Sequence, residues 1–445
     1  MAIFLALYFK NVLLSLFGGI VLGVFLLQGY SVGDTFVGVY ELFISLLSEA
    51  WILKTLAFAI LVGSVMELLE RSGAVEHFVA ALTQKQTIFA TKKGALLLPF
   101  FIGVVIFIES SITSLIAGAV GKPLCNAQKI PAAKLALVCD STAAPVSSLI
   151  LFNGWGALLL GLISTQIEDG IIGGDGVALL MESVVYNFYA LSAVLVVFIT
   201  ITKEIDLGAM KNIRFTPMAQ QTVSASPSLA QLLLPIFVMV GGVFFYLYQT
   251  GSGDILQGSG STSIFYTMLT TLAFLFVYYV FGGVISTKEY ISYSLSGAKK
   301  LFGIAMVLLF AFGIGKVTSQ MHTGLYLASF ASENIDVVFL AALIFLLSGV
   351  MAFSTGTSWG TFSIMIPIAV PMAVTLGADV ALVIAAVVSG GVFGDHCSPI
   401  SDTTIISSMA SGCDVLEHVK TQLPYALLSG AVAFSLFVVF GLLKS

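Results

Sequence analysis

Long apolar segments separated by short polar loops dominate the chain. Segments of this kind lie at residues 10–28, 51–70, 177–201, 229–249, 264–285, 301–320 and 422–443. The hydrocarbon core of a bilayer is about 30 Å thick, and about 20 residues of apolar helix span it. The segments lack the alternating pattern of barrel strands, so they predict membrane-spanning helices.

Three further apolar regions carry polar interruptions. Residues 94–121, 134–165 and 336–410 contain Ser, Thr, Gly, Pro and acidic residues within their apolar stretches. Irregular backbone at membrane depth is tolerated only where protein or a water-filled cavity surrounds it. The pattern is typical of re-entrant hairpins and broken helices in transporters.

Composition supports a membrane protein and excludes several other classes. Hydrophobic residues make up 58% of the 445 residues, charged residues make up 9%, and the mean hydropathy is +1.06. The formal charge of -5 comes without a basic stripe, which argues against nucleic acid as a partner. The four cysteines have no disulfide-like or metal-like spacing, and no cofactor is expected. Residues 1–28 lack a cleavage pattern and are predicted to form the first membrane helix.

The distribution of Lys and Arg predicts the orientation in a plasma (inner) membrane. With the N-terminus in the cytoplasm, most basic residues fall in inner loops, whereas the loops at 168–176 and 251–263 have none. The region 94–121 then forms a hairpin entering from the cytoplasm, and 336–377 forms one entering from outside. The two halves have the same order of elements in opposite orientation. We therefore predict one transporter domain over 1–445, with inverted repeats at about 51–201 and 301–443 and linking or scaffold helices at 229–285.

A similar run of residues occurs in each half. Residues 140–147 read DSTAAPVS and residues 395–401 read DHCSPIS, so each run has an aspartate followed by a proline and a serine. Proline removes a backbone donor and breaks the helical hydrogen-bond ladder. Pro145 and Pro399 are therefore predicted to break two membrane-spanning helices and to free carbonyl oxygens there.

The acidic residues in these regions suggest ion chemistry. A carboxylate at membrane depth is costly when it is ionised and unpaired, so it should hold a cation or a proton. Competition between Na⁺ and H⁺ for one carboxylate is the simplest basis for their exchange. Asp140 and Asp395 are the leading candidates for binding Na⁺ and H⁺, and Asp402 and Glu109 come next. The hydroxyl groups expected at the hairpin tips or beside the ions belong to Ser110, Ser111, Thr142, Thr355, Thr357, Ser358, Ser398 and Ser401.

Each candidate also has a structural interpretation. Asp140 or Asp402 can cap the half-helix that follows a break, and Glu109 can pair with a cytoplasmic lysine. His396 is either a proton carrier or a structural histidine. Glu67 is expected to be interfacial. The sequence places His418, with the other two histidines, in loops or at interfaces.

Other functional classes have less support. The chain has no GxGD, HExxH or GxSxG motif, which argues against an intramembrane enzyme. The hydroxyl-rich hairpins would also suit a channel. The predicted inverted repeat favours alternating access instead.

The run at residues 394–404, GDHCSPISDTT, together with 413–414 and 418–426, closely resembles the signature of the NhaC family of Na⁺/H⁺ antiporters. Residues 140–146 are similar to that family's first-half motif. The resemblance implies the ion-transporter superfamily architecture, with paired inverted repeats and two hairpins. It also implies a homodimer with a scaffold and an elevator-like moving domain.

The resemblance leaves the substrate open. Relatives with similar motifs exchange Na⁺ for H⁺, exchange malate and lactate, or carry amino acids. Arg71 and Arg214 are the only arginines, and both are placed in cytoplasmic loops, so no arginine is expected to clamp a carboxylate. We therefore predict a Na⁺/H⁺ antiporter. The alternative is a Na⁺-coupled transporter or exchanger of a small organic acid or amino acid.

Overall fold

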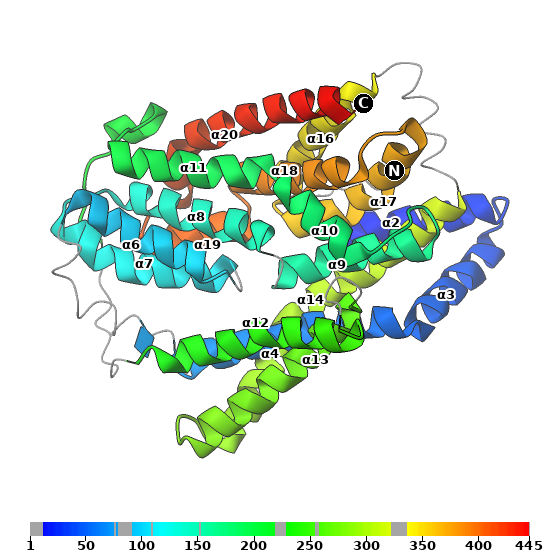
Figure 1. Cartoon of the computed structure of the whole chain (residues 1–445), viewed down its shortest axis with the longest axis horizontal. Coiled ribbons are helices and arrows are strands. Elements are labelled where there is room, and N and C mark those ends of the chain that lie inside the picture. The colour runs from blue at the N-terminus through cyan, green and yellow to red at the C-terminus, as the bar shows by residue number, and fades with distance from the viewer. Residues whose placement is uncertain are drawn as a thin grey trace.

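Helices form every regular element of the computed structural model, within the residues that it describes (Figure 1). These residues are 12–74, 77–78, 91–107, 110–150, 153–218, 228–253, 258–321 and 336–444. Ten of the described helices are long and apolar enough to cross a membrane. The prediction of an all-helical, multi-pass membrane protein is confirmed.

The N-terminal helices include one that the hydrophobic pattern did not predict. α2 (Val12–Leu27) matches the segment 10–28, whereas α3 (Val32–Ser48) is an additional helix. Asp34 and Glu41 interrupt its apolar run, so it was not recognised as a span. Its exposed apolar side chains include Phe36, Tyr40 and Ile44, spaced by about one helical turn.

Two long helices cross closely at a pair of glycines. α4 (Ala50–Arg71) packs along α14 (Thr287–Gln320). A Cβ atom at Gly63 would lie 2.3 Å from the carbonyl oxygen of Gly297, and one at Gly297 would lie 2.0 Å from that of Gly63. Close backbone contact at small residues is a common basis of helix packing in membranes.

The helices α12 (Ala230–Thr250) and α13 (Gly260–Leu275) pack against each other, and α13 also contacts α4. A short π-helical turn, η4 (Phe276–Phe281), follows α13. Figure 1 shows α4, α12 and α13 together along one side of the molecule. The two helices match the predicted segments 229–249 and 264–285.

The segment 177–201 is not one span, as predicted, but two helices. α10 (Gly176–Val185) ends near Tyr186, and α11 (Phe188–Lys203) begins after Asn187. The side chain of Asn187 accepts a hydrogen bond from the backbone N–H of Ala190, which caps the new helix. A short 3₁₀ turn, η2 (Gly208–Asn212), follows α11.

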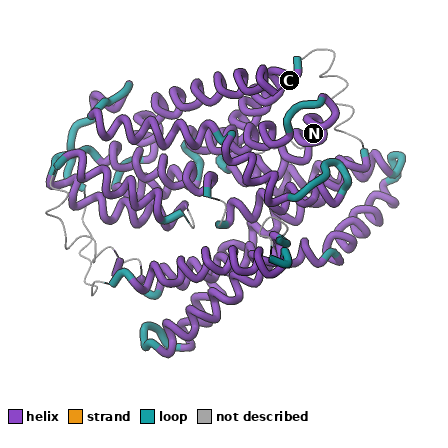
Figure 2. The backbone as a smooth tube through the Cα atoms, in the orientation of Figure 1, coloured by secondary structure: helices purple, strands orange, loops and turns teal. Residues whose placement is uncertain are grey.

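Four pairs of helices account for the three interrupted regions. In the first half, α6 (Lys92–Val105) precedes α7 (Ser110–Ala127), and α8 (Ala132–Leu149) precedes α9 (Gly154–Glu168). In the second half, the turn η5 (Val337–Phe339) leads into α16 (Leu340–Thr355), which precedes α17 (Ser358–Leu376). α18 (Val380–Cys397) then precedes α19 (Asp402–Ser411), and α20 (Val415–Lys444) completes the chain. Figure 2 shows how loops and turns connect the helices along the described backbone.

The two halves keep one register over these four pairs. The helices that begin at Lys92, Ser110, Ala132 and Gly154 have counterparts that begin at Leu340, Ser358, Val380 and Asp402, each 248 residues later. Both α8 and α18 contain 18 residues. In this register Asp395 corresponds to Ser147, and Asp140 corresponds to Val388. The two aspartates therefore occupy different positions in their halves, although the sequences around them are similar.

The helix boundaries also correct the prediction that Pro145 breaks its helix. Pro145 lies inside α8, and the N–H of Ile150 still bonds to the carbonyl of Val146, so the helix continues beyond the proline. The helix ends at Leu149, and the next one begins at Gly154. Pro399 does lie in the break between α18 and α19, as predicted. A proline disrupts only the bonds made by its own nitrogen and ring, and buried packing on both sides can carry a helix past it.

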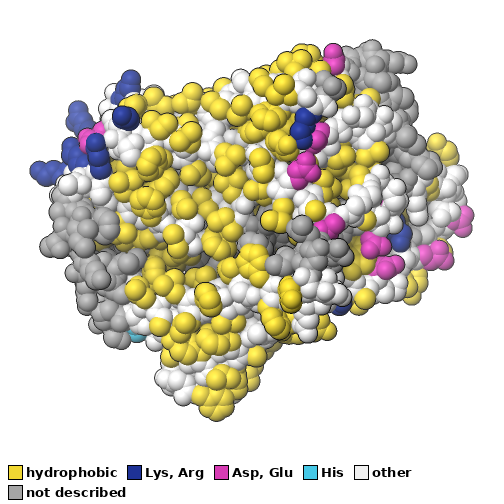
Figure 3. Space-filling view, viewed as in Figure 1, with side chains coloured by type: hydrophobic (Ala, Val, Ile, Leu, Met, Phe, Trp, Pro, Cys, Tyr) yellow, Lys and Arg dark blue, Asp and Glu magenta, His cyan; other side chains and the backbone are white. Residues whose placement is uncertain are grey.

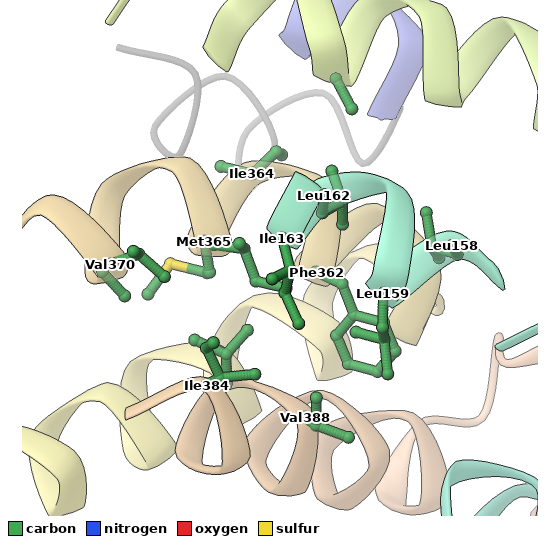
Figure 4. Packing of buried hydrophobic residues seen from close by; sticks show 14 of the residues in the cluster. Leu158, Leu159, Leu162, Ile163, Phe362, Ile364, Met365, Val370, Ile384 and Val388 are labelled. Carbon is green, nitrogen blue, oxygen red and sulfur yellow. The ribbon is translucent and has the colours of Figure 1, made fainter. Parts of the chain in front are cut away.

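The second member of each broken pair packs into the opposite half of the chain. α9 contacts α17 and α14, whereas α19 contacts α7 and α8. Figure 4 shows Leu159 and Ile163 of α9 beside Phe362 and Met365 of α17, with Ile384 and Val388 of α18 on the other side. This exchange places residues of α19 and α20 against α8.

Candidate functional site

Asp140 is the centre of a fully buried polar cluster. It lies in the middle of α8 and has no solvent exposure. Its Oδ2 atom accepts a hydrogen bond of 2.6 Å from Nε2 of Gln422 and lies 3.2 Å from Nε2 of His418. The hydroxyls of Thr404 and Ser407, on α19, each donate to the carboxylate at 3.4 Å. Asp140 is therefore ligated by side chains and does not cap a half-helix.

His396 is the second imidazole of this cluster. Its Nε2 atom lies 3.7 Å from Oδ2 of Asp140 and 3.2 Å from the hydroxyl of Ser141. Its Nδ1 atom lies 2.7 Å from the hydroxyl of Tyr189, on α11. If the Tyr189 hydroxyl donates to Nδ1, the ring proton of a neutral His396 is on Nε2 and points toward Ser141 and Asp140.

The cluster contains one carboxylate between two imidazoles that are also buried. The Nδ1 atom of His418 has no hydrogen-bond partner in the described part of the chain. A neutral His418 would then carry its proton on Nε2, facing Asp140. Because imidazole and carboxylate both change charge by taking up a proton, this arrangement can store and release protons.

Asp395 occupies a different environment. It lies near the end of α18 and is 1% exposed. The hydroxyl of Ser358 donates to its Oδ2 atom at 3.3 Å, and its Oδ1 atom has no hydrogen-bond partner among the described residues. No basic side chain of the described residues lies within ion-pair distance of it. A buried carboxylate with an unpaired oxygen requires a proton or a cation to become stable.

Local backbone geometry positions Asp395. A Cβ atom at Gly394 would lie 2.0 Å from the carbonyl oxygen of Gly349, so this glycine allows α18 to approach α16. Gly356, with φ +68°, ends α16, and a Cβ there would lie 2.7 Å from the carbonyl oxygen of Ile400. The tip between α16 and α17 thus packs directly on the break between α18 and α19.

The hydroxyl groups predicted in the second half mainly organise these breaks. Thr357 caps α17 by accepting from the N–H of Gly360, and Ser401 caps α19 by accepting from the N–H of Thr404. Ser398 donates to the carbonyl of Phe353 at 2.8 Å, which ties the break to α16. Thr355 donates to the carbonyl of Met351 within its own helix. Of the predicted hydroxyls, Ser358 and Ser401 face the carboxylate of Asp395.

Asp402 is the first residue of α19, not its cap. Its side chain is exposed, and its Oδ1 atom accepts from the N–H of Thr403 at 2.9 Å. A carboxylate in the first turn of a helix is favoured by the helix dipole, so this contact has a structural explanation. No hydrogen bond joins Asp402 to Asp140 or Asp395 among the described residues, but its charge repels both carboxylates.

The first-half tip is described only in part. Glu109, together with the side chain of Ser111, lies outside the described residues. Ser110 is buried at the start of α7, and Thr142 donates to the carbonyl of Val138 within α8. Asn153 caps α9 and donates from its amide to the carbonyl of Phe107 at 2.9 Å. Asn153 therefore ties the tip of the first hairpin to the break between α8 and α9.

Several site residues were not predicted. The interpretation of His418 as a loop or interface residue is wrong, because it is fully buried beside Asp140. The predicted set of site residues also lacks Gln422, Tyr189, Thr404 and Ser407. The sequence does contain a signal for His418 and Gln422, since these two residues are one helical turn apart near the start of an apolar helix. The contacts themselves depend on the packing of α20 and α19 against α8.

The donor set favours an alkali cation or a proton over a transition metal. No group of three or more His, Cys, Asp or Glu side chains that could hold a metal occurs within the described ranges. The unpaired oxygens are Oδ1 of Asp395 and Oε1 of Gln422, which are hard donors. Oxygen donors of this kind suit hard cations.

Comparison with known proteins identifies the class. The model of the Na⁺/H⁺ antiporter family matches residues 149–442, and this chain belongs to that family. An uncharacterised protein of Haemophilus influenzae is 32% identical to it over 96% of this chain and 86% of the relative.

Two relatives named as antiporters match shorter regions. The malate-2H⁺/Na⁺-lactate antiporter of Bacillus subtilis is 37% identical over 23% of this chain and 22% of the relative. An uncharacterised Na⁺/H⁺ antiporter of Haemophilus influenzae is 38% identical over 29% of this chain and 26% of the relative. Among solved structures, the Alcanivorax borkumensis YdaH transporter has a TM-score of 0.62 at 14% identity and covers 92% of this chain and 89% of its own. This likeness shows a shared fold.

Proposed function

We propose that this protein exchanges Na⁺ for H⁺ by alternating access, with Asp395 as the carboxylate that binds the two ions in turn. The observation that carries the proposal is the buried, unpaired Oδ1 atom of Asp395. The side chain is 1% exposed and its neighbours Ser358 and Ser401 are neutral hydroxyls, so the ionised form lacks a compensating positive charge. Either Na⁺ or H⁺ supplies that charge, and one excludes the other.

Asp140 has a separate role in this proposal. Its carboxylate already has two imidazole neighbours and an amide donor, so a bound cation is not needed to stabilise it. The cluster of Asp140, His396 and His418 is a proton-binding group beside the ion site. His396 follows Asp395 directly in the sequence, so a change at either site can affect the backbone that positions the other.

The register that the two halves share over the four helix pairs supports alternating access. Each half supplies two helix pairs in the same order, 248 residues apart. Two equivalent gates on opposite faces are what inverted repeats provide. Family membership supports Na⁺ and H⁺ as the transported ions.

The test is the pH change inside proteoliposomes when NaCl is added, with no organic solute present. We expect a Na⁺-dependent proton flux that is lost in Asp395→Asn. Glu70→Gln, which removes a half-exposed carboxylate that contacts neither Asp395 nor Asp140, is the control and should retain flux. Wild-type exchange in Asp395→Asn would overturn the assignment of the ion site.

Asp140→Asn separates the two carboxylates. It should lower proton-coupled exchange strongly while Na⁺ binding, measured by isothermal titration calorimetry, persists. Equal loss of Na⁺ binding in Asp140→Asn and Asp395→Asn would mean that both aspartates form one cation site. If wild-type protein gives no flux with NaCl but gives flux after malate, lactate or an amino acid is added, the substrate is an organic solute.

A further inference from the structure

A basic cavity lies away from the aspartate cluster, where the start of α6, the α7–α8 turn and the end of α11 meet. Its volume is about 290 Å³. Four lysines from these elements and from η2 line it: Lys92, Lys129, Lys134 and Lys211. Figure 3 shows basic side chains gathered at the end of the molecule where these elements lie in Figure 1.

The charges of this cavity are only partly balanced. Glu204 and Asp206 also line it, but Asp206 lies 2.7 Å from Nζ of Lys134. Glu204 lies 3.9 Å from Nζ of Lys93, which is outside the cavity. Among the described residues, no carboxylate lies within ion-pair distance of Lys92, Lys129 or Lys211. The cavity therefore has unpaired positive charge that an anion can neutralise.

Two lining residues have a strained backbone. Lys129 and Glu204 both have φ +53°, and they are two of the four non-glycine residues with positive φ in the described part of the chain. Glycine is favoured at such helix ends because it has no Cβ. Side chains other than glycine that persist in this conformation often serve a function. Here the conformation directs Lys129 and Glu204 to the cavity.

Exposed apolar side chains lie on two of the helices that form the cavity. Ile201 of α11 lines the cavity. The preceding turns of the same helix expose Leu195, Phe198 and Ile199. On α6, Phe101 is also exposed. A lipid whose anionic headgroup is held by the lysines can therefore place its acyl chains along these apolar side chains.

We propose that this cavity binds the phosphate headgroup of an anionic phospholipid. Basic pockets at the ends of membrane helices attract anionic lipids, and each nearby lysine or arginine contributes to the attraction. Lys134 lies in the first turn of α8, the helix that carries Asp140. A headgroup bound here holds one end of the helix that supplies the proton-binding carboxylate.

The test is native mass spectrometry of purified protein titrated with phosphatidylglycerol, compared with phosphatidylcholine. The double variant Lys129→Gln/Lys211→Gln should lower phosphatidylglycerol affinity about tenfold or more, because each lysine contributes to the binding of an anionic lipid. Lys288→Gln/Lys299→Gln, which removes two exposed lysines of α14, is the matched control and should retain affinity.

A second arm distinguishes the lipid from a free anion. Inorganic phosphate at millimolar concentration should displace phosphatidylglycerol poorly, since it cannot use the apolar surface of α11. Displacement of phosphatidylglycerol by an equal concentration of inorganic phosphate would mean that the cavity binds free phosphate. That result would overturn the lipid assignment. The proposal also fails if both double variants keep wild-type affinity, or if both lose it equally.

Discussion

The Nε2 atom of His418 lies 3.2 Å from the Oδ2 atom of Asp140, although the two residues are 278 positions apart in the chain. The contact joins α20 to α8 through a side chain that is fully buried. Gln422, one turn further along α20, donates to the same oxygen. The C-terminal helix thus supplies two of the partners of a carboxylate from the first half.

Removal of the His418 imidazole should change how exchange depends on pH. His418→Gln keeps a hydrogen-bonding side chain beside Asp140 but removes an imidazole that can carry a proton. We expect a slower Na⁺-dependent proton flux with a less steep pH profile. The flux of the variant and of the wild type should be compared in proteoliposomes across the range in which imidazole titrates. An unchanged profile at wild-type rate would show that His418 only fills space.

Tyr189→Phe should weaken the orientation of His396. The variant loses the 2.7 Å contact between the hydroxyl and Nδ1, and a buried hydrogen bond contributes about 1 kcal/mol. We expect lower exchange with intact folding, measured by flux and by thermal unfolding in detergent. Tyr246→Phe, which removes an exposed tyrosine hydroxyl bonded to Thr270 on α13, is the control and should have little effect. Equal losses in both variants would contradict a specific role for Tyr189.

Gly297→Ala should destabilise the crossing of α4 and α14. The added Cβ would lie 2.0 Å from the carbonyl oxygen of Gly63, which is backbone and cannot move aside without separating the helices. Overpacking of this kind typically costs about 1–3 kcal/mol. Gly303→Ala, on the same helix with no atom within 4 Å of its Cβ, should be tolerated. The two variants should be compared by thermal unfolding in detergent, where similar midpoints would argue against a tight crossing.

Glu67→Gln should destabilise the same pair of helices without abolishing exchange. That Glu67 is interfacial stays a prediction; within the fold its side chain is 1% exposed. It lies 2.7 Å from Nε of Arg71, accepts from the hydroxyl of Ser296 at 3.1 Å and pairs with Lys300 of α14. Hydrogen bonds to charged groups contribute about 1.5–3 kcal/mol in buried sites, and the partly exposed partners place this variant at the lower end.

The control for this prediction is Glu70→Gln. Glu70 is about half exposed and lies 4.0 Å from the same lysine, so its replacement should leave the unfolding temperature almost unchanged. Exchange should survive in both variants, because neither residue contacts the aspartate clusters. Complete loss of exchange in a folded Glu67→Gln protein would place this ion pair on the transport pathway.

The sequence by itself determined the class of the protein and most of the membrane-spanning helices. Apolar runs of sufficient length must be helical in lipid, because no water is available to satisfy the backbone there. Polar interruptions also marked the regions that contain both Asp140 and Asp395. The helix α3 and the division at Asn187 were missed, since short polar interruptions within an amphipathic or capped helix resemble the interruptions of a loop.

Only the tertiary structure decided which side chains meet. The letters around Asp140 and Asp395 suggested equivalent sites, whereas the helix boundaries pair Asp395 with Ser147. The local chemistry of Pro145 is compatible with a helix break, but packing on both sides keeps α8 helical to Leu149. His418 looked peripheral because its neighbours in sequence are charged, yet the fold buries it against a carboxylate. Local sequence specifies helices, whereas contacts across hundreds of residues depend on how α19 and α20 pack against α8.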